Sequence, residues 1–374
     1  MTGTRTHEAG HVDGRGPGSD LVQGADDYDA RSAEFMSRFG LGGGTARSTR
    51  LTAGLNGIAV RIAPYADPFA AQLLSDLAVW VFAFDDLCDE DLPHLTPTGM
   101  LTMVARLQRT IEAPEVPLDG DPFGLALRDI RLRVDAIATP VQVRRWVDAM
   151  RGYFLAEARI GADTTAPRGP EDVSDYLLTR LHSGAALAVP VLLDAVGAAL
   201  PAPSWEDRRI RALTEMAAGI VVVDSDIHSF AKESERGSRS GNLIALLEGP
   251  QGPGSGSGSG SGPGSRPGQG LQAASALRDS MMSRFLHLGR QTAMAPADPR
   301  IAHFLDALTQ YVHGVRDWCG ATSRYHPEQP DDTRNQSRGA GTGVRPPDGT
   351  SLAPPPIASI AWWWAVDGAP PSSA

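Results

Sequence analysis

Two long apolar stretches of this chain each end in a short acidic cluster, and that combination limits what the chain can fold into. The stretch 77–84 leads into the first cluster, 85–90, and the stretch 217–223 leads into the second cluster, 225–233. Because an unpaired buried charge is very costly, carboxylates at the end of an apolar stretch need a cation nearby. We therefore expect each cluster to lie at the end of an apolar helix and to meet cations there.

The size and charge of the chain exclude several classes of protein. Its 374 residues are enough for one large domain or two ordinary ones. A net charge of -10 with scattered arginines argues against nucleic acid as a partner. The two cysteines, Cys88 and Cys319, form neither a metal pattern nor a disulfide framework. No stretch reaches the roughly 18 to 20 apolar residues that span a membrane, and residues 1–20 lack a signal peptide, so we expect a soluble, cytoplasmic protein.

Three stretches have the composition of unfolded chain. Residues 1–47 are rich in Gly, Asp, Arg and Ser, residues 249–270 contain a Gly-Ser repeat typical of a flexible linker, and residues 327–374 are rich in Pro, Gly and Ser. We expect a disordered tail at each end and a flexible insertion within one domain, 48–326. The three tryptophans at 362–364 could dock on the core or on a partner, or form an exposed apolar patch in a disordered tail.

The domain between the tails has the pattern of helices almost throughout. Apolar residues recur at i, i+3, i+4 and i+7, Pro97 and Pro140 suit the first position of a helix, and no alternating strand pattern is present. The expected helices are 70–84, 97–113, 140–160, 173–200, 206–233, 243–247, 271–291 and 302–325. The expected fold class is therefore all-α, a single bundle of roughly ten helices.

The spacing within the first cluster favours a magnesium site. Asp85 and Asp89 are four residues apart and share one face of a helix, and Asp86 lies about 100° round from Asp85. Carboxylates are hard oxygen ligands, and Mg²⁺ fills the rest of its coordination shell with water and substrate phosphates. An EF-hand is excluded, because Leu87 and Glu90 stand where its loop needs a ligand and a glycine. We expect Asp85, Asp86 and Asp89 to be metal ligands.

The second cluster repeats this spacing with weaker ligands. Ser225, Ser229 and Glu233 follow one another at intervals of four residues, so all three can face one direction over two helical turns. Lys232, the only lysine of the chain, could reach a phosphate oxygen. Two such clusters on separate helices of one bundle would hold a diphosphate and its metal ions between them. The alternative is that each cluster is ordinary solvated surface charge.

The two clusters together resemble a known pair of motifs. Residues 85–90 are similar to the aspartate-rich DDxxD motif of class I terpene synthases in its bacterial form, and 225–233 is similar to the family's NSE triad. Ser225 stands where the family usually has asparagine, while the rest of the triad matches. A serine hydroxyl is a shorter and poorer ligand than an amide oxygen, so that metal would be held loosely or through water, unless the neighbouring Asp224 and Asp226 compensate.

Two further segments carry the same resemblance. The segment around Arg180 is similar to the stretch that bears the family's diphosphate-sensing arginine, and Gly184 would be the effector position, with its carbonyl at a helix break. Trp318 and the pair Arg324-Tyr325 are similar to the family's C-terminal helix and its RY motif. The resemblance therefore implies a catalytic role for Arg180 and Gly184.

Membership of that family would fix the fold, the reaction and the cofactor. The resemblance covers about residues 50–326 and implies a class I terpenoid synthase bundle with a central active-site cavity. It also implies a prenyl diphosphate substrate, C15 or C20 by preference, and three Mg²⁺ ions that act as Lewis acids on the diphosphate. Ionisation of the allylic diphosphate would release diphosphate and leave a cation that cyclises.

Four residues would bind the diphosphate under this interpretation. Arg180, Lys232 and Arg324 would add fixed positive charge, and the Tyr325 hydroxyl would donate a hydrogen bond. No protein nucleophile is needed for such a reaction.

Two aromatic residues are candidates to stabilise the cation. Aromatic faces attract cations through their quadrupole. Phe82 lies three residues before Asp85 on the same helical face, and Trp318 lies before Arg324 on the last helix of the domain. Ordinary core packing is the alternative for both.

Two other functions stay open at this point. An isoprenyl diphosphate synthase elongates prenyl chains on the same fold, but it normally has a second aspartate-rich motif, and the second motif here is rich in hydroxyls. A non-catalytic helical scaffold would use its acidic patches to bind cations or a partner. A homodimer is compatible with each of these functions.

Overall fold

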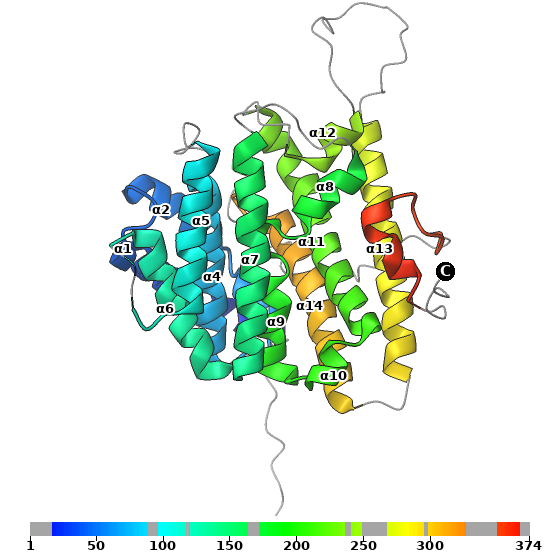
Figure 1. Cartoon of the computed structure of the whole chain (residues 1–374), viewed down its shortest axis with the longest axis horizontal. Helices are drawn as coiled ribbons and strands as arrows, with labels where there is room; N and C mark the ends of the chain where they lie inside the picture. Colours follow the sequence, from blue (N-terminus) through cyan, green and yellow to red (C-terminus); the bar gives the residue numbers. More distant parts are fainter. Residues whose placement is uncertain are drawn as a thin grey trace, which may run out of the picture.

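Helices make up the regular structure of the described residues, and no strand occurs among them (Figure 1). The computed structural model describes residues 17–88, 96–116, 118, 120–163, 172–235, 241–248, 268–294, 298–326 and 350–366. The elements are α1 (Pro17–Phe39), α2 (Thr45–Ala53), α3 (Ile58–Ile62), α4 (Pro68–Asp86), α5 (Pro97–Glu112), α6 (Pro122–Ile137), α7 (Pro140–Asp163), α8 (Val173–Arg180), η2 (Ser183–Ala185), α9 (Ala188–Leu193), η3 (Asp194–Ala198), α10 (Ala202–Trp205), α11 (Arg208–Glu235), α12 (Leu243–Glu248), α13 (Gln269–Met294), α14 (Pro299–Ala321) and η5 (Ala358–Trp364). One large apolar core joins them, and the expected all-α class is confirmed.

Five of the described helices begin with a capping residue that is followed directly by proline. The side chains of Asp67, Thr96, Asp121, Thr139 and Asp298 each accept a hydrogen bond from a backbone N–H in the first turn. Proline follows at the first helical position, where its missing N–H costs nothing. These dipeptides fix the starts of α4, α5, α6, α7 and α14. Helix α4 begins at Pro68 and is 19 residues long, so Asp85 and Asp86 of the first cluster are its last two residues.

Helix α4 is the apolar centre of one side of the bundle. Trp80 and Phe84 stack on each other with ring centroids 5.2 Å apart. Phe123 from α6 and Phe154 from α7 pack edge-on against both rings. The end of α4 is therefore placed against α7, which bears on the position of the first cluster.

Helix α4 is also long and apolar enough to cross a membrane by length and composition alone. In the bundle, 67% of its apolar window is buried, as in the core helix of a folded domain. Within the described residues, the only other candidate is the broken pair 173–180 and 183–198, and it qualifies only if both arms count as one span. Neither observation is more than weak evidence for a span.

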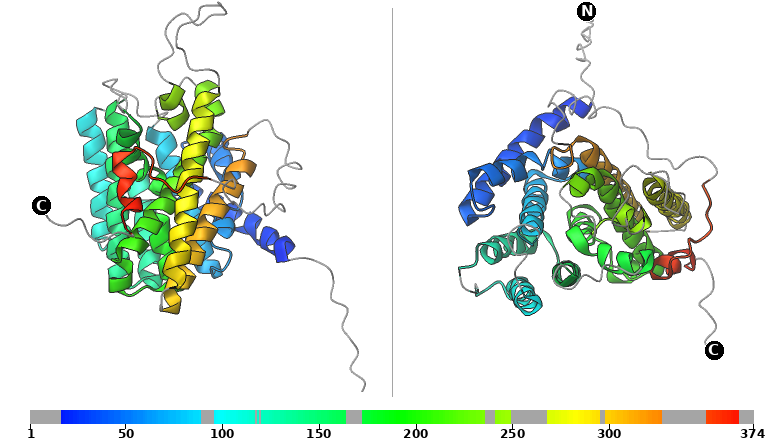
Figure 2. Two further views of the ribbon diagram at one scale, coloured as in Figure 1. Left: turned by 90° about the vertical axis from the view of Figure 1, so that its right-hand side faces the viewer. Right: turned by 90° about the horizontal axis from the view of Figure 1, so that it is seen from above.

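The expectation of a disordered tail over residues 1–47 is wrong from α1 onward. Ser32 on α1 is buried and donates a hydrogen bond of 2.6 Å to Asp76 on α4. Met36, one turn later, is fully buried in the core. Figure 2 shows α1 along one edge of the bundle. The many Gly and Asp residues of this segment hid an amphipathic pattern, and residues 1–16 lie outside the described residues.

The expectation of a disordered tail over residues 327–374 is wrong for 350–366. There the chain returns to the bundle and forms η5, which carries the tryptophans 362–364 against the core (Figure 2). The tryptophan run thus docks on the core of its own chain. Residues 327–349 and 367–374 lie outside the described residues.

Helices α11 and α13 hold the tryptophan run. Trp362 and Trp363 both donate their indole N–H to Glu215 on α11, at 3.2 and 3.0 Å, and Arg284 on α13 donates to the Trp363 carbonyl at 3.0 Å. A Cβ on Gly219 would lie 3.0 Å from the Trp363 ring, so this glycine lets the indole approach α11. A buried tryptophan removes about 150–250 Å² of surface from water. This burial offsets the conformational entropy that the Pro- and Gly-rich segment loses when it becomes ordered.

The stretch 173–200 is broken near its middle and is not one helix. Helix α8 ends at Arg180 and α9 begins at Ala188, and the two arms differ in direction by 66°. Gly184 lies between them with φ 62°, a conformation that glycine adopts without strain. The break falls at the position that the family resemblance implies.

Other elements also differ from the sequence expectation, and the short helices α2, α3 and α10 were not expected. Helix α6 was not expected, because its apolar stripe is interrupted by charged residues. Helix α14 ends at Ala321, so the pair 324–325 lies in the turn that follows the helix. Helix α13 begins at Gln269, inside the expected insertion, and residues 249–267 of that insertion lie outside the described residues.

Candidate active site

The first cluster lies at the end of α4, where two partners hold its carboxylates. Tyr153 on α7 donates its hydroxyl to Asp85 Oδ1 at 2.7 Å, and Arg324 donates to Asp86 Oδ1 at 2.8 Å. Burial, reinforced by the Asp85 charge, raises the pKa of Tyr153 well above its ordinary value, so the phenol stays a donor. Asp89, the third expected ligand, lies outside the described residues.

The pair Arg324-Tyr325 joins the two clusters. While Arg324 contacts Asp86 on α4, the Tyr325 hydroxyl lies 3.3 Å from Ser225 Oγ on α11. Burial would lower the pKa of the Arg324 guanidinium, but the Asp86 carboxylate raises it. Burial raises the pKa of Tyr325, which therefore stays protonated. Two adjacent side chains thus contact one residue of each cluster. The end of α4 and the part of α11 around Ser225 therefore lie on either side of this pair.

Arg180, the expected sensing arginine, is anchored to α11 by an ion pair with Asp226. Its Nη2 lies 2.8 Å from Asp226 Oδ1, and its Nη1 donates to Ser183 Oγ at 2.5 Å. Tyr176 donates its hydroxyl to Asp226 Oδ2 at 2.5 Å. Burial would lower the pKa of Arg180, but Asp226 raises it well above its ordinary value. Burial raises the pKa of the Asp226 carboxyl, against the opposing effects of Arg180 and Tyr176.

The acidic neighbours of Ser225 are committed to other partners. Asp226 pairs with Arg180 on α8, and Asp224 accepts a hydrogen bond of 2.7 Å from Arg278 on α13. Because successive residues of a helix lie about 100° apart, the two carboxylates serve opposite neighbours of α11. These ion pairs join α11 to α8 and to α13 on either side of Ser225. Both carboxylates therefore already have a cationic partner.

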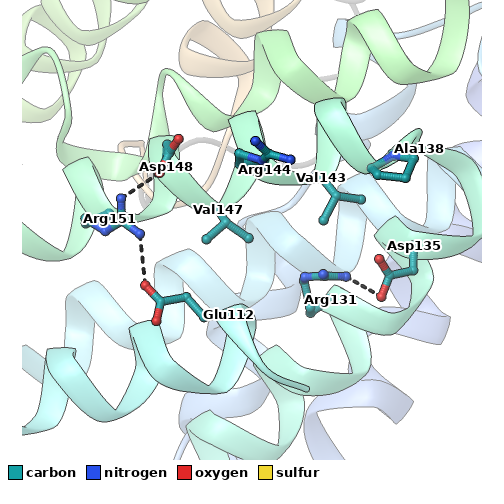
Figure 3. Close-up of a pocket in the computed structure, with 10 residues that line it drawn as sticks. Glu112, Arg131, Asp135, Ala138, Val143, Arg144, Val147, Asp148 and Arg151 are labelled. Carbon is teal, nitrogen blue, oxygen red and sulfur yellow. Dashed lines mark hydrogen bonds and ion pairs between the residues drawn. The ribbon is translucent and has the colours of Figure 1, made fainter. Parts of the chain in front are cut away.

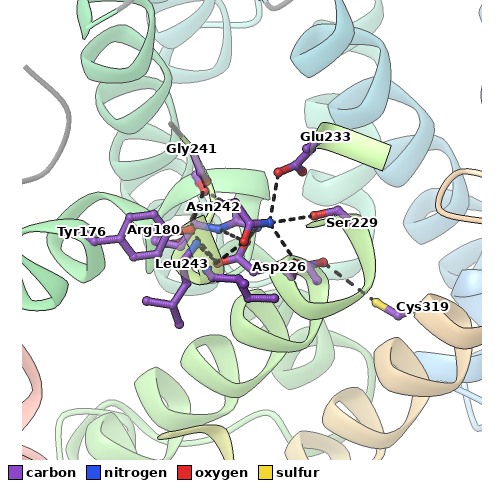
Figure 4. A network of polar contacts seen from close by, with 12 residues as sticks. Tyr176, Arg180, Asp226, Ser229, Glu233, Gly241, Asn242, Leu243 and Cys319 are labelled. Atoms are coloured by element: carbon purple, nitrogen blue, oxygen red, sulfur yellow. Dashed lines mark hydrogen bonds and ion pairs between the residues drawn. The ribbon is translucent and has the colours of Figure 1, made fainter. Parts of the chain in front are cut away.

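Ser229 and Glu233 converge on one side chain, that of Asn242 just before α12. Asn242 Nδ2 lies 3.3 Å from Ser229 Oγ and 3.0 Å from Glu233 Oε2 (Figure 4). The two oxygens therefore face the same point, as the interval of four residues predicts. Lys232 lies in the last turn of α11 and is half-buried.

Phe82 and Trp318 form an aromatic stack next to the Arg324-Tyr325 pair. Their rings lie 5.4 Å apart at 17°, and Tyr325 packs edge-on against Trp318 at 5.3 Å. The Arg324 guanidinium lies 4.7 Å from the centre of the Phe82 ring. Trp318 is buried and donates its indole N–H to Gly54 O at 2.9 Å. The stack therefore supports the pair that joins the two clusters.

The described side chains do not form a complete ligand set for a metal ion by themselves. Among the described residues, no group of three His, Cys, Asp or Glu side chains lies close enough to hold an ion alone. The first cluster offers two described carboxylates, and the second offers one carboxylate and two hydroxyls. Mg²⁺ is usually bound by one or two carboxylates together with water and substrate phosphates. This donor set, all oxygen, suits a hard ion that arrives with a diphosphate.

Comparison with known proteins places this chain in a family. Residues 76–252 match the family model described as terpene synthase family 2, C-terminal metal binding. A (+)-T-muurolol synthase of Streptomyces clavuligerus, named as cyclising (2E,6E)-farnesyl diphosphate, is 32% identical over 339 residues, which are 90% of this chain and 77% of that protein. The chain belongs to the class I terpene synthases.

Other relatives of this synthase agree. A (+)-(1(10)E,4E,6S,7R)-germacradien-6-ol synthase of Streptomyces pratensis is 30% identical over 345 residues, which are 91% of this chain and 92% of that protein. The crystal structure of the SVS_A2 protein from ancestral sequence reconstruction matches with a TM-score of 0.71 and 26% identity, covering 91% of this chain and 94% of that one. The synthase is therefore an enzyme that cyclises a prenyl diphosphate, and the family model implies dependence on a divalent metal.

Sequence reasoning missed four residues that position the site, namely Tyr153, Tyr176, Ser183 and Asn242. Ser183 lies three residues after Arg180, and its hydroxyl could have been suspected as a partner from that spacing. Asn242 stands just before an apolar run, which is a signal for a helix cap. Nothing in the sequence distinguishes the two tyrosines from other aromatic residues, because their partners lie 68 and 50 residues away.

A hollow of about 510 Å³ also lies on the outer face, between α5, α6 and α7 (Figure 3). Its charged lining consists of three arginines and three acids, Arg131, Arg144, Arg151, Glu112, Asp135 and Asp148. Ion pairs join Arg151 to Glu112 and to Asp148, and Arg131 to Asp135. None of the expected site residues lines this hollow. Its positive and negative charges balance, so it does not attract a diphosphate.

Proposed function

We propose that this synthase ionises farnesyl diphosphate with three Mg²⁺ ions held between the first and second clusters. The proposed ligands are Asp85, Asp86, Asp89, Ser225, Ser229 and Glu233. The observation that carries the proposal is that Arg324 contacts Asp86 while Tyr325 contacts Ser225. One diphosphate group at that point would meet ligands from both clusters.

The residues around the clusters would receive the diphosphate. Bound metal ions supply Lewis acidity at the diphosphate oxygens. Arg180, Lys232 and Arg324 add positive charge that does not depend on metal, and the Tyr325 hydroxyl donates a hydrogen bond. Arg180 and Arg324 are held by the carboxylates of Asp226 and Asp86, which limits the freedom of both side chains before the substrate arrives.

The organic half of the substrate would lie against the apolar side of the same helices. Phe82 and Trp318 are the proposed aromatic lining, and their stack beside Arg324 supports a place next to the diphosphate. The helix break at Gly184 would present a backbone carbonyl to the substrate, as the family resemblance implies. Phe82→Leu should then change the ratio of products while the enzyme still consumes substrate.

A C15 substrate is the first choice because of the relatives. The T-muurolol synthase is named for cyclising farnesyl diphosphate, and this chain aligns with it over 90% of its own length. A C20 substrate is the second choice. The relatives reported above are named for cyclised products, which argues against chain elongation as the main reaction and against a non-catalytic scaffold.

The test is product analysis with purified protein. Geranyl, farnesyl and geranylgeranyl diphosphate are each incubated with Mg²⁺, with and without isopentenyl diphosphate, and the extracts are separated by gas chromatography. We expect a cyclic hydrocarbon or alcohol from farnesyl diphosphate, no need for isopentenyl diphosphate, and no product after chelation with EDTA. Longer linear prenyl diphosphates made only with isopentenyl diphosphate would instead identify a chain-elongating enzyme.

We also propose a cytoplasmic location and a homodimer. Size-exclusion chromatography with light scattering tests the second of these directly. A mass of one chain of 39.5 kDa across the working concentration range would contradict the dimer.

A further inference from the structure

Asn242 lies behind the second cluster, with its side chain buried and its polar atoms engaged. The residue is 1% exposed. Its Nδ2 lies 2.9 Å from Asp226 O, 3.3 Å from Ser229 Oγ and 3.0 Å from Glu233 Oε2 (Figure 4). Its Oδ1 accepts a hydrogen bond of 2.9 Å from Ile244 N. Both ends of one amide are therefore used, one by α12 and the other by α11.

The backbone decides which way this amide faces. The N–H of Ile244 can only donate, so the atom next to it must be Oδ1, and the NH₂ group must face Ser229 and Glu233. Asn242 therefore cannot offer its oxygen to a metal at the second cluster without uncapping α12. It does not replace the asparagine that the family has at position 225, and any effect on a metal must pass through Ser229 and Glu233.

A neutral donor suits this position. The amide holds one carboxylate oxygen of Glu233 and the hydroxyl of Ser229, and it leaves Glu233 Oε1 and the remaining lone pairs open to a cation. Hydrogen bonds from outside the coordination shell orient metal ligands, and their loss typically weakens metal binding by about 10–100-fold. An arginine at this place would orient the ligands equally well, but its charge would repel the metal.

We propose that Asn242 is a positioning residue that holds Ser229 and Glu233 in the geometry in which they bind a divalent metal ion. The inference rests on the proposed function, because it takes these two residues as metal ligands. The competing explanation is that Asn242 serves only as the cap of α12.

The neighbours of Asn242 make a clean test feasible. Tyr176 donates its hydroxyl to Gly241 O at 3.1 Å, and the Leu243 N–H lies 3.4 Å from Asp226 Oδ2. These contacts hold the segment against α8 and α11 without the Asn242 amide. Serine caps helices about as well as asparagine, but its side chain is too short to reach Ser229 and Glu233. Asn242→Ser therefore keeps the cap and removes the donor.

The experiment measures Mn²⁺ binding in the presence of inorganic diphosphate, from the loss of the free-ion electron paramagnetic resonance signal. Wild type, Asn242→Ser, Glu233→Gln and Asp298→Ser are compared as full-length proteins. Asp298→Ser makes a similar cap exchange at the start of α14, a 23-residue helix whose other end leads to the pair 324–325. We expect an apparent dissociation constant at least about 10-fold higher in Asn242→Ser, with wild-type circular dichroism, and no change in Asp298→Ser.

Each outcome decides the matter. Unchanged Mn²⁺ binding in Asn242→Ser, with weakened binding in Glu233→Gln, overturns the positioning role and leaves the proposed metal site intact. Unchanged binding in Glu233→Gln overturns both. Equal weakening in Asn242→Ser and Asp298→Ser shows an effect of capping alone and also overturns the role. If Asn242→Ser does not fold, Asn242→Thr makes the same exchange with more buried volume and is judged by the same criteria.

Discussion

The two acidic clusters are alike in spacing, but their partners lie at different distances along the chain. The partners of the first cluster, Tyr153 and Arg324, lie 68 and 238 residues away from the carboxylates that they contact. In the second cluster, Asn242 lies 13 residues from Ser229 and 9 from Glu233, and only Ser225 among the expected ligands contacts a distant residue, Tyr325. The first cluster is therefore complete only when α7 and the segment after α14 have docked on α4, whereas Ser229 and Glu233 are held by the residue that begins the next helix in the chain.

The clusters also differ in charge. All three expected ligands of the first cluster are carboxylates, whereas only one of the three expected ligands of the second, Glu233, is a carboxylate, and it meets the neutral amide of Asn242. Coulomb attraction for a cation is therefore weaker at the second cluster, and its metal ions depend more on the diphosphate that arrives with them. The contrast predicts that disturbing the first cluster affects the whole reaction, while parts of the second cluster tolerate exchange.

The largest effect is expected from removing one carboxylate from either cluster. Asp85→Asn and Glu233→Gln keep the size of the side chain but remove a charged ligand. Since loss of a supporting hydrogen bond already costs about 10–100-fold, turnover should fall at least about 100-fold, with unchanged helical circular dichroism. Asp148→Asn, an exposed carboxylate on α7, is the matched control. Undiminished turnover in either variant would remove that cluster from the reaction.

The next largest effect should come from Arg324→Met, which leaves Asp86 without its cation and the diphosphate without one charge. A lost charged hydrogen bond is worth about 1.5–3 kcal/mol, so kcat/KM should fall by roughly 10–100-fold. Arg151→Met on the outer face serves as the control. A full retention of kcat/KM would mean that the contact between the two clusters is only structural.

A smaller effect is expected from Tyr153→Phe, which removes one hydrogen bond to Asp85 and no charge. The Mg²⁺ concentration at half-maximal rate should rise about 10-fold, with little change in the maximal rate at saturating metal. Tyr28→Phe on α1 controls for the loss of a phenol. A fall in maximal rate with an unchanged metal midpoint would show that Tyr153 acts on the substrate and not on the Asp85 ligand.

The smallest effect is expected at Ser225, the one departure from the family pattern. Ser225→Asn supplies an amide oxygen and loses the weak contact with Tyr325. One such hydrogen bond is worth about 1 kcal/mol, so activity should stay within about fivefold of wild type or rise. A well-folded but inactive Ser225→Asn protein would show that this position does not face the metal ions.

The sequence predicted the parts of the site that depend on local spacing. The interval 229–233 correctly places Ser229 and Glu233 on one side of α11. The likeness to the RY motif singled out Arg324 and Tyr325, which contact Asp86 and Ser225, although not that they lie beyond the end of α14. Tyr153 and Tyr176 could not be found, since a contact between residues so distant in sequence is set by packing of the whole bundle.

The fold was predictable where periodicity dominates, and composition misled at both ends. Helices α4, α5 and α7 lie within a few residues of their expected bounds. Helix α1 was missed because its many Gly and Asp residues are typical of unfolded chain. Its burial depends on a few residues, such as Ser32 and Met36, which do not stand out in the composition. The tryptophan segment was missed as an ordered element because its stabilisation comes from Glu215 and Arg284, partners on other helices.

The most direct measurement is a crystal structure of the synthase with Mg²⁺ and inorganic diphosphate. One diphosphate should lie between the clusters, with at least one metal ion on Asp85 or Asp86 and another on Glu233, and with Arg180 and Arg324 turned toward its oxygens. A diphosphate bound elsewhere, or metal ions on one cluster alone, would contradict a shared site.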